Sequence, residues 1–369
     1  MRIVLVSNTT WSIINFRLNL IKHLINQKHE IHIVGPSDGF EKELSSLRLT
    51  FHSIMLNRKG VNPLKNLAII NALEKIYKSV KPDLIIHYTI KPNIYGSIAA
   101  NRAKIPSLAI VTGLGFVFIN DGMVSNIAKY LYKRAFRYPT EVWFLNQEDK
   151  QIFIDGNLVS AGKTKILPGE GVDMTKFVPK DYTESKEPFT FLYVGRVLID
   201  KGLREYIASA KSILSLGANV KFQILGNHDK DYPLALPEEE FTKAKDDKLV
   251  EYLGYTNDVP GVMCNADCIV LASYREGVPL VLLEACSMEI PIVATNVTGC
   301  NEVIVDNVNG FICEAKDEES LTKALIKMQD TSKERRMEMG KAGRALVEQK
   351  FNEEIVFKQF DKFIASVKK

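Results

Sequence analysis

The chain has 369 residues, of which 46% are hydrophobic, so it is long enough for two domains with sizeable cores. No run of about 18 apolar residues predicts a membrane span, and the start MRIVLVSN is typical of a first strand rather than of a signal peptide. The net charge of +4 is unevenly distributed: residues 1–180 carry 24 Lys+Arg against 13 Asp+Glu, and residues 181–369 carry 24 against 31. The basic half favours an anionic partner such as nucleic acid, phospholipid head groups or a phosphorylated substrate, unless the asymmetry is chance.

Short apolar segments alternate with longer segments of helical periodicity along the whole chain. This alternation predicts βαβ units with parallel strands. In chain order the predicted strands are RIVLVS, EIHIVG, FHSIML, DLIIHY, SLAIVT and EVWFLN, followed by TFLYVG, VKFQIL, CIVLAS, PIVATN and GFICE. We therefore expect an α/β protein with two Rossmann-like domains facing each other across a cleft. The fingerprint GxGxxG is missing after the first strand of each domain, which argues against nicotinamide chemistry.

The boundary between the predicted domains lies in the segment 166–189, which is rich in proline, glycine and charged residues, as a hinge is. At the other end of the chain, FNEEIVFKQFDKFIASV has helical apolar spacing and predicts a closing helix. We predict an N-terminal domain over residues 1–168, a linker over 169–188, a C-terminal domain over 189–349, and a closing helix over 350–369 that returns to the N-terminal domain.

The stretch YVGRVLIDKG, Tyr193–Gly202, places two cations just after a predicted strand. Gly195 allows a close approach of the backbone, and Arg196 and Lys201 follow before the next helix. An arginine offers a fork of donors that suits a diphosphate, and a lysine adds a compact positive charge. The pattern predicts a phosphate site, although two solvated surface charges would give the same pattern.

The stretch YREGVPLVLLE, Tyr274–Glu284, places two glutamates eight positions apart. Glu276 follows a predicted buried strand, and Pro279 suits the first position of the helix that carries Glu284. Both side chains can therefore point at the crevice beyond the carboxyl end of a parallel strand, where open α/β sheets bind ligands. Each glutamate taken alone would more often be a solvated side chain.

In combination, GRxxxxKG followed about 75 residues later by E-x7-E closely resembles the retaining glycosyltransferases of family 4, which have the GT-B fold. The resemblance covers the whole chain and includes EGVDMTKF at 170–177, ADCIVLAS at 266–273 and TGCNEVIVDNVNGFI at 298–312. It implies that Arg196 and Lys201 hold the diphosphate of a nucleotide sugar. It also implies that Glu284 receives the ribose hydroxyls and that Glu276 faces the sugar. Main-chain amides of Gly277, Val278 and Leu280 at the helix start would meet the phosphate and the hexose.

The N-terminal half is most similar to bacterial transferases that extend undecaprenyl-diphosphate-linked sugars, N-acetylgalactosaminyltransferases among them. The similar segments are INFRLNLI at 14–21, IKPNIYGSIAA at 90–100 and GLGFVFI at 113–119. Arg17, His87 and Lys91 are the candidate acceptor contacts in this half. For His87 the alternative is a structural role, which is more common for a histidine at a strand end.

The chain departs from the family pattern at two places. Many members have paired glycines after the first strand, where this chain has NTTWS at 8–12. Many also have a histidine after the fifth strand that contacts the donor hexose, whereas this chain has TGLGF at 112–116. The second departure predicts a subgroup with different contacts to the sugar.

The region 116–138 combines aromatic and basic residues. In GMVSNIAKYLYKRAFRY, Lys129, Lys133 and Arg137 recur at steps of four, and Arg134 is adjacent to one of them. Such a helix suits an anionic membrane surface, where the lipid tail of the acceptor would lie. An ordinary amphipathic helix with a basic outer face is the alternative.

We expect no metal ligands and no cofactor beyond the UDP-sugar donor. The DxD pattern at Asp229 and Asp231 lies in a polar loop before Pro233, and the pairs Cys264/Cys268 and His29/His32 lack partners at metal-ligand spacing. The five cysteines also match no redox CxxC pair, which favours a reduced, cytoplasmic compartment.

The sequence therefore predicts a retaining hexosyltransferase, cytoplasmic and peripheral on the inner face of the cell membrane. Its expected substrates are a UDP-sugar, with an N-acetylhexosamine such as N-acetylgalactosamine, and an undecaprenyl-diphosphate-linked saccharide of bacterial glycan assembly. A nucleotide-sugar 2-epimerase of similar fold is the alternative, and it would interconvert the sugar without an acceptor. A nucleic-acid binder is the third possibility, but no interleaved recognition motif supports it.

Overall fold

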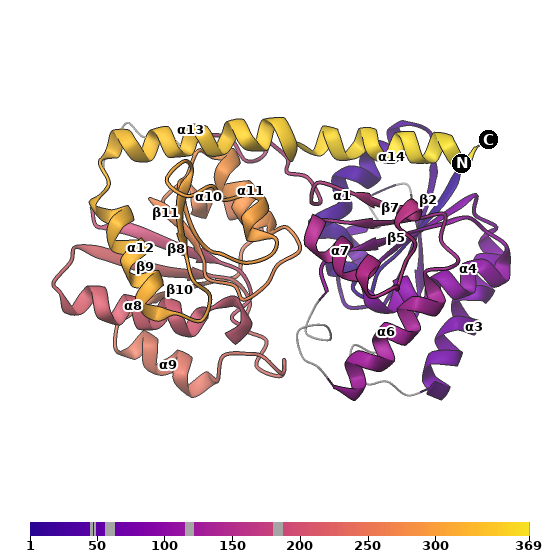
Figure 1. Ribbon diagram of the computed structural model, residues 1–369, viewed down its shortest axis with the longest axis horizontal. Coiled ribbons are helices and arrows are strands. Elements are labelled where there is room, and N and C mark those ends of the chain that lie inside the picture. The colour runs from indigo at the N-terminus through magenta and orange to yellow at the C-terminus, as the bar shows by residue number, and fades with distance from the viewer. Residues whose placement is uncertain (45–46, 48, 56–62, 115–121, 180–186, 369) are drawn as a thin grey trace. The chain divides into compact units, whose positions relative to one another are not determined.

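The computed structural model describes residues 1–44, 47, 49–55, 63–114, 122–179 and 187–368. The chain divides into two compact units (Figure 1). Unit 1 comprises Met1–Glu170 with Glu354–Lys369, and unit 2 comprises Gly171–Glu353. Within the described ranges, no helix is both long enough and apolar enough to cross a membrane.

Unit 1 is built around one sheet, in which the described residues form seven parallel strands in the order β3-β2-β1-β4-β5-β6-β7. The strands are β1 Arg2–Val6, β2 Glu30–Gly35, β3 Leu49–Ser53, β4 Leu84–Tyr88, β5 Ser107–Val111, β6 Glu141–Phe144 and β7 Thr164–Ile166. The central strands are continuous apolar runs, as expected where helices cover both faces of a parallel sheet. The direction of the strand order reverses between β1 and β4, so the carboxyl ends of these two strands form the switch point of unit 1.

The helices of unit 1 other than the last connect these strands. They are α1 Thr10–Asn26, α2 Glu41–Leu44, α3 Pro63–Val80, the π-helix η1 Pro92–Gly96, α4 Ser97–Ala103, α6 Met123–Ala135, α7 Gln147–Asp155, η2 Ala161–Lys163 and α14 Glu353–Val367. The last helix, α14, packs its apolar face against the sheet of unit 1. The ring centre of Phe360 lies 5.0 Å from that of Trp143 in β6. Asp361 accepts a hydrogen bond from His23 of α1 at 3.1 Å.

Unit 2 has the same construction, with six described parallel strands in the order β10-β9-β8-β11-β12-β13. They are β8 Phe189–Val194, β9 Val220–Leu225, β10 Glu251–Gly254, β11 Cys268–Leu271, β12 Ile292–Thr295 and β13 Gly310–Cys313. The helices are η3 Ile199–Lys201, α8 Leu203–Ser215, α9 Glu238–Asp246, α10 Val259–Met263, α11 Leu280–Ser287, η4 Cys300–Glu302, α12 Glu318–Asp330 and α13 Lys333–Lys350.

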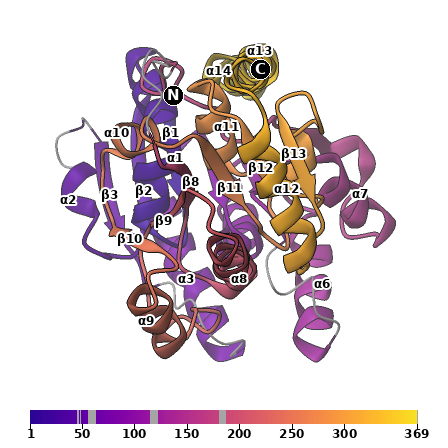
Figure 2. The same ribbon diagram turned by 90° about the vertical axis from the view of Figure 1, so that its left-hand side faces the viewer.

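Helices cover both faces of the unit 2 sheet. Helix α8 packs on α12, and α11 packs on α13 (Figure 2). Helix α8 connects β8 to β9, and α11 connects β11 to β12, so the two connections run in opposite directions along the sheet. Because crossovers between parallel strands are right-handed, these two helices lie on opposite faces. The switch point of unit 2 is therefore between β8 and β11, and their carboxyl ends open toward the loops that carry the predicted donor motifs.

All eleven predicted strands are present, and the expected α/β class with two Rossmann-like units is confirmed. Two strands were missed, β7 and β10, and β3 begins at Leu49 rather than at Phe51. All three lie at a sheet edge. An edge strand has one neighbour and more exposure, so its sequence lacks the continuous apolar run by which a central strand is recognised.

The first domain was predicted to end at residue 168, and the first segment of unit 1 ends at Glu170. Residues from Glu354 onward, which form the closing helix, belong to unit 1. The beginning of the predicted linker 169–188 packs against unit 2. Val172 N–H donates to the carbonyl of Phe351 at 2.9 Å, and the Phe177 carbonyl accepts a hydrogen bond from Ser287 at 2.6 Å. Residues 180–186 of the linker lie outside the described residues.

Candidate functional site

The predicted donor motifs of unit 2 follow two neighbouring strands. GRVLIDKG leaves β8, SYREGVP leaves β11, and these strands are hydrogen-bonded in parallel, with Leu192 opposite Ile269. The carboxyl ends of parallel strands meet at one edge of the sheet, so both loops begin at the switch point. The fold thus brings together two motifs that are about 75 residues apart in the chain.

The loop after β8 begins with a close backbone approach. A Cβ at position 226, after β9, would lie 1.8 Å from the carbonyl oxygen of Gly195, so only glycine fits there. The Tyr193 hydroxyl donates to the Arg196 carbonyl at 2.7 Å and fixes the turn. The Arg196 side chain is exposed, with its guanidinium carbon 5.0 Å from the ring centre of Tyr232. An exposed guanidinium braced on an aromatic face can meet an anionic ligand.

The Lys201 loop and the Glu276 loop are in direct contact. Gly202 has a φ of 74°, and a Cβ there would lie 2.1 Å from the carbonyl oxygen of Ala272 at the end of β11. Lys201 Nζ lies 2.5 Å from Oε1 of Glu276, and the two side chains are 21% and 15% exposed. The ion pair was not predicted from the sequence, where the resemblance gave these two side chains different parts of the donor.

Further hydrogen bonds fix the course of the Glu276 loop. Tyr274 N–H donates to the Asp200 carbonyl at 3.0 Å, and its hydroxyl donates to Glu205 of α8 at 2.7 Å. Glu276 N–H donates to the Thr298 carbonyl at 3.1 Å. Gly299, with a φ of 85°, passes so close that a Cβ would lie 2.5 Å from the Glu276 carbonyl oxygen. Both loops are therefore held by contacts within the protein itself, which is the preorganisation that a binding site needs.

Helix α11 carries the second glutamate. Pro279 is the N-cap residue rather than the first helical residue, one position from the prediction, and Glu284 is in the second turn. Desolvation raises the pKa of Glu284 to about 7, and the positive charge of Lys176 partly opposes the shift. These surroundings favour the neutral form of the carboxyl more than water does, and a ligand or a cation can compensate the charge of the ionised form.

Gly277, Val278 and Leu280 occupy the turn from the Glu276 loop into α11, with Val278 buried. Their amides lie at the start of an eight-residue helix, where backbone N–H groups point out of the helix end and the helix dipole favours an anion. Asp200, next to Lys201, is a further carboxyl of this site. Burial raises its pKa, while Lys201 and Arg196 act in the opposite direction.

The three candidate acceptor residues of unit 1 have different surroundings. Arg17 is 3% exposed: it is ion-paired with Glu170, donates to the Ser12 carbonyl at 2.8 Å, and lies over the Tyr88 ring at 4.2 Å. These contacts engage both terminal nitrogens of the guanidinium within the interior of the unit. Glu170 has a raised pKa because of its burial, with Arg17 opposing the shift.

His87 is fully buried at the end of β4, and burial lowers its pKa to about 3. Its Nε2 is 3.1 Å from the Tyr77 hydroxyl, and a Cβ at Gly96 would lie 2.4 Å from the imidazole ring. This is the structural role that the sequence left open, so the expectation that His87 contacts an acceptor is set aside. Lys91 is partly buried beside the switch point of unit 1, and burial lowers its pKa.

The basic helix of the region 116–138 is α6, and residues 116–121 of that region lie outside the described residues. Only Ser125, Tyr132 and Ala135 of α6 are buried. Three apolar residues at helical spacing are exposed: Met123, Ile127 and Tyr130, at 80%, 38% and 58%. Lys133, Arg134 and Arg137 are exposed near the C-terminal end. A helix that exposes both large apolar and basic side chains has the character of an interfacial helix.

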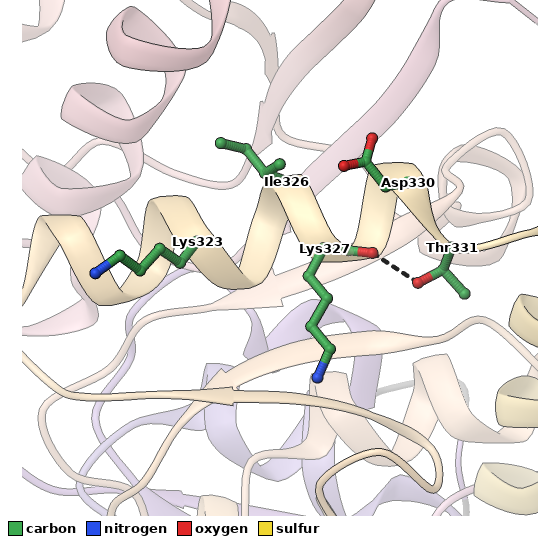
Figure 3. A pocket seen from close by; sticks show the side chains of 5 residues that line it. All are labelled: Lys323, Ile326, Lys327, Asp330 and Thr331. Atoms are coloured by element: carbon green, nitrogen blue, oxygen red, sulfur yellow. Dashed lines mark hydrogen bonds between the residues drawn. The ribbon is translucent and has the colours of Figure 1, made fainter.

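Within the described residues, no group of three or more His, Cys, Asp or Glu side chains is placed to hold a metal ion. Asp229 and Asp231 are exposed, and the lysine between them is ion-paired with Glu238. A surface hollow of about 480 Å³ lies elsewhere in unit 2 (Figure 3). Its lining residues, Lys323, Ile326, Lys327, Asp330 and Thr331, all come from α12 and its C-cap, so it has no second wall to enclose a substrate.

Comparison with known proteins decides the family. The family models "Glycosyl transferases group 1" and "Glycosyl transferase 4-like" match residues 174–346 and 2–146. The N,N'-diacetylbacillosaminyl-diphospho-undecaprenol alpha-1,3-N-acetylgalactosaminyltransferase of Campylobacter jejuni is 30% identical to this chain over 342 residues, with 88% of each covered. The chain belongs to the GT4-type glycosyltransferases. An Escherichia coli UDP-Gal:alpha-D-GlcNAc-diphosphoundecaprenol alpha-1,3-galactosyltransferase is also 30% identical to this transferase, over 83% of this chain and 82% of the relative.

Solved structures agree with the GT-B fold. Anabaena HepE in complex with UDP and glucose has a TM-score of 0.80 and 19% identity, over 99% of this transferase and all of that chain. A glycosyltransferase from Rickettsia africae has a TM-score of 0.80 and 18% identity, over 100% and 98%. The predicted family, fold and hexosyltransferase activity are thereby confirmed.

Neither Ser273 nor Asp200 was predicted to belong to the donor site, although both lie within the two motif loops. Ser273 donates to Glu276, and Asp200 lies beside Lys201. A serine or an aspartate near a strand end is common in any loop, so no signal distinguished them before the two loops were seen together.

Proposed function

We propose that this transferase moves an N-acetylhexosamine, such as N-acetylgalactosamine, from its UDP-linked donor to an undecaprenyl-diphosphate-linked saccharide, with retention at the anomeric carbon. The observation that carries the proposal is the meeting of Arg196, Lys201 and Glu276 at the β8/β11 switch point. The names of the two relatives at 30% identity, which act on undecaprenyl-diphosphate-linked sugars, support the acceptor class. One relative is named for N-acetylgalactosamine and the other for galactose, so the donor sugar is the first part of the proposal to test.

In the proposed donor complex, the exposed guanidinium of Arg196 and the ammonium of Lys201 bind the diphosphate. The N-terminal end of α11, with Gly277, Val278 and Leu280, adds backbone donors toward the phosphate and the hexose. Glu284 receives the ribose hydroxyls, and Glu276 faces the hexose. HepE, whose structure holds UDP and glucose, shares this fold and supports a UDP-linked donor.

The reaction we propose is a front-face displacement. The bond from the anomeric carbon to the diphosphate breaks, and Arg196 and Lys201 stabilise the charge that develops on the leaving oxygen. The acceptor hydroxyl attacks from the same face, and the departing phosphate oxygen takes its proton. Glu276 provides a negative charge near the anomeric centre, where positive charge develops. Two cations and a helix end can stabilise the diphosphate, so we propose that no metal is required.

For the acceptor we propose the corresponding switch point of unit 1, with Lys91 as the residue to test. Lys91 follows β4 at this switch point and is partly buried, so its ammonium can meet an anionic group such as the acceptor's diphosphate there. Helix α6 would rest on the anionic inner face of the membrane and bring the enzyme to its lipid-linked substrate. The basic character of unit 1 is thereby ascribed to lipid phosphates and not to nucleic acid.

The test is a screen of UDP-sugars against short-chain lipid-diphosphate-linked N-acetylhexosamines, read by mass spectrometry. The expected result is a product heavier by one N-acetylhexosamine, with an α-linkage by nuclear magnetic resonance. A parallel incubation with UDP-N-acetylhexosamine alone tests the 2-epimerase alternative. Interconversion of the sugar without an acceptor, together with no transfer to any acceptor, would overturn the proposal.

A further inference from the structure

The carboxylate of Glu276 is held at one of its two oxygens. Lys201 Nζ lies 2.5 Å from Oε1, and the hydroxyl of Ser273 donates to the same Oε1 at 2.6 Å. Both hydrogen bonds found for this carboxylate within the described residues end on Oε1, so Oε2 is the oxygen that is left for a ligand. The orientation of Oε2 therefore depends on how firmly Oε1 is held.

Ser273 has a rigid position. It comes two residues after the end of β11 and is 0% exposed. Its carbonyl accepts a hydrogen bond from Thr295 Oγ1, at the end of β12, at 2.5 Å. A hydroxyl attached to a buried strand end that is tied to the neighbouring strand can fix a partner at low cost in conformational entropy.

Lys201, by contrast, has two possible partners. In the structure it is paired with Glu276, whereas in the proposed function it binds the donor diphosphate. A diphosphate carries more negative charge than one carboxylate and competes for the single ammonium. Arrival of the donor then weakens the contact of Lys201 with Oε1 and leaves Ser273 as the contact that does not depend on the donor.

We propose that Ser273 is the positioning residue that keeps Oε1 of Glu276 in place when Lys201 turns to the donor diphosphate, so that Oε2 stays directed at the hexose. This inference rests on the proposed function, because it requires that Glu276 faces the sugar and Lys201 the diphosphate. Ser273 itself touches neither. Its hydroxyl is needed in the step in which Glu276 acts and is dispensable for binding of UDP.

The experiment compares Ser273→Ala with Ser273→Thr and Ser273→Cys. Misplacement of a reacting group by about 1 Å can lower turnover about a hundredfold, so we expect Ser273→Ala to lower kcat by roughly ten- to a hundredfold. UDP affinity by calorimetry should stay within about twofold of wild type. The threonine variant keeps the hydroxyl and should recover most of the turnover, while the cysteine variant fills the space with a weak donor and should behave like alanine.

Ser209→Ala is the matched control. Ser209 is also 0% exposed, and its hydroxyl accepts a hydrogen bond from Thr322 at 2.9 Å, between α8 and α12. Its loss should lower the melting temperature without lowering kcat. If Ser273→Ala does not fold, the cysteine and threonine variants carry the comparison, and equal turnover of these two would overturn the proposal.

A double-mutant cycle separates this inference from the proposed function. In a Glu276→Ala background, Ser273→Ala should have no further effect on kcat, because the group it positions is gone. If Glu276→Gln leaves turnover normal, the proposed function of Glu276 is wrong. If Glu276→Gln lowers turnover and Ser273→Ala does not, only the positioning role of Ser273 is wrong.

Discussion

The raised pKa of Glu284 leads to a prediction about the pH dependence of donor binding. Desolvation brings its pKa from 4.5 to about 7, so both forms of the carboxyl are populated near neutral pH. Hydrogen bonds donated by two ribose hydroxyls favour the ionised form. Binding of UDP should therefore release a proton from Glu284, and the affinity for UDP should weaken as the pH falls below about 7.

The magnitude follows from the ionised fraction. With a pKa of about 7, roughly nine tenths of Glu284 is ionised at pH 8 and roughly one tenth at pH 6. If only the ionised form accepts both hydroxyls, this residue contributes a loss in affinity of about tenfold between these pH values, or about 1.4 kcal/mol. UDP titrates in the same range, so the quantity to compare is the difference between wild type and Glu284→Gln, in which only the protons of the ligand remain.

The assay is calorimetric titration of UDP at pH 6, 7 and 8 in two buffers of different ionisation enthalpy. Wild type should release more protons than Glu284→Gln at pH 6, and the difference should vanish by pH 8. Identical proton release by the two proteins at pH 6 would refute the assignment of the ribose hydroxyls to Glu284.

Protein stability provides an independent measure of the same pKa. The folded pKa lies above the unfolded value, so the folded state binds the proton more tightly than the unfolded state does. The contribution of Glu284 to stability is fully present below about pH 4.5 and is lost as the pH rises through about 7. Glu284→Gln should remove this part of the pH dependence, as measured by the urea midpoint. The size of the effect should be smaller than the shift alone suggests, because the residue is partly exposed.

Three further predictions concern the diphosphate, metal independence and the membrane. Arg196→Ala and Lys201→Ala should each lower kcat/KM by a hundredfold or more, since removing one donor to a developing anion typically costs about 3 kcal/mol; near-normal kinetics in both would remove the diphosphate assignment. Activity should persist in excess EDTA. If EDTA abolished activity and magnesium or manganese restored it, Asp229 and Asp231 would become the candidate metal ligands. Lys133→Glu with Arg134→Glu should weaken binding to phosphatidylglycerol vesicles, measured by flotation, by about thirtyfold or more, at about 1 kcal/mol per basic residue lost, while Lys323→Glu on α12 should not.

The sequence was sufficient for the central strands and for the positions of the donor motifs. A run such as LIIHY is buried on both faces and is recognisable without a partner, and Glu276 and Glu284 lie in the loop and the helix that were expected. The edge strands β7 and β10 were not recognisable because their few residues are partly exposed. Local patterns thus located the parts of the sheet that are buried on both faces.

Contacts across the sheet could not be predicted. The ion pair of Lys201 with Glu276 exists because β8 and β11 are neighbours in the sheet. Neither motif by itself predicts which strands are neighbours. The same limit applies to His87, whose inward direction depends on the absence of a side chain at Gly96. Arg17 was expected at the acceptor, and its burial depends on Glu170, which is 153 residues away in the chain.

The last prediction separates the roles of the two glutamates. The ribose does not react, so the hydrogen bonds that Glu284 accepts should be equally strong in the ground state and the transition state, and their loss should raise the Michaelis constant for the donor. Glu276 would lie near the anomeric carbon, where charge develops only during the reaction, so Glu276→Gln should mainly lower kcat. Calorimetry at pH 8 should show weaker UDP binding by Glu284→Gln and nearly normal binding by Glu276→Gln. Because Lys201 is paired with Glu276, the glutamine variant also frees this ammonium for the diphosphate, and its UDP affinity should even rise slightly. If Glu276→Gln loses UDP affinity and Glu284→Gln does not, the donor lies in the opposite orientation along the β8/β11 edge.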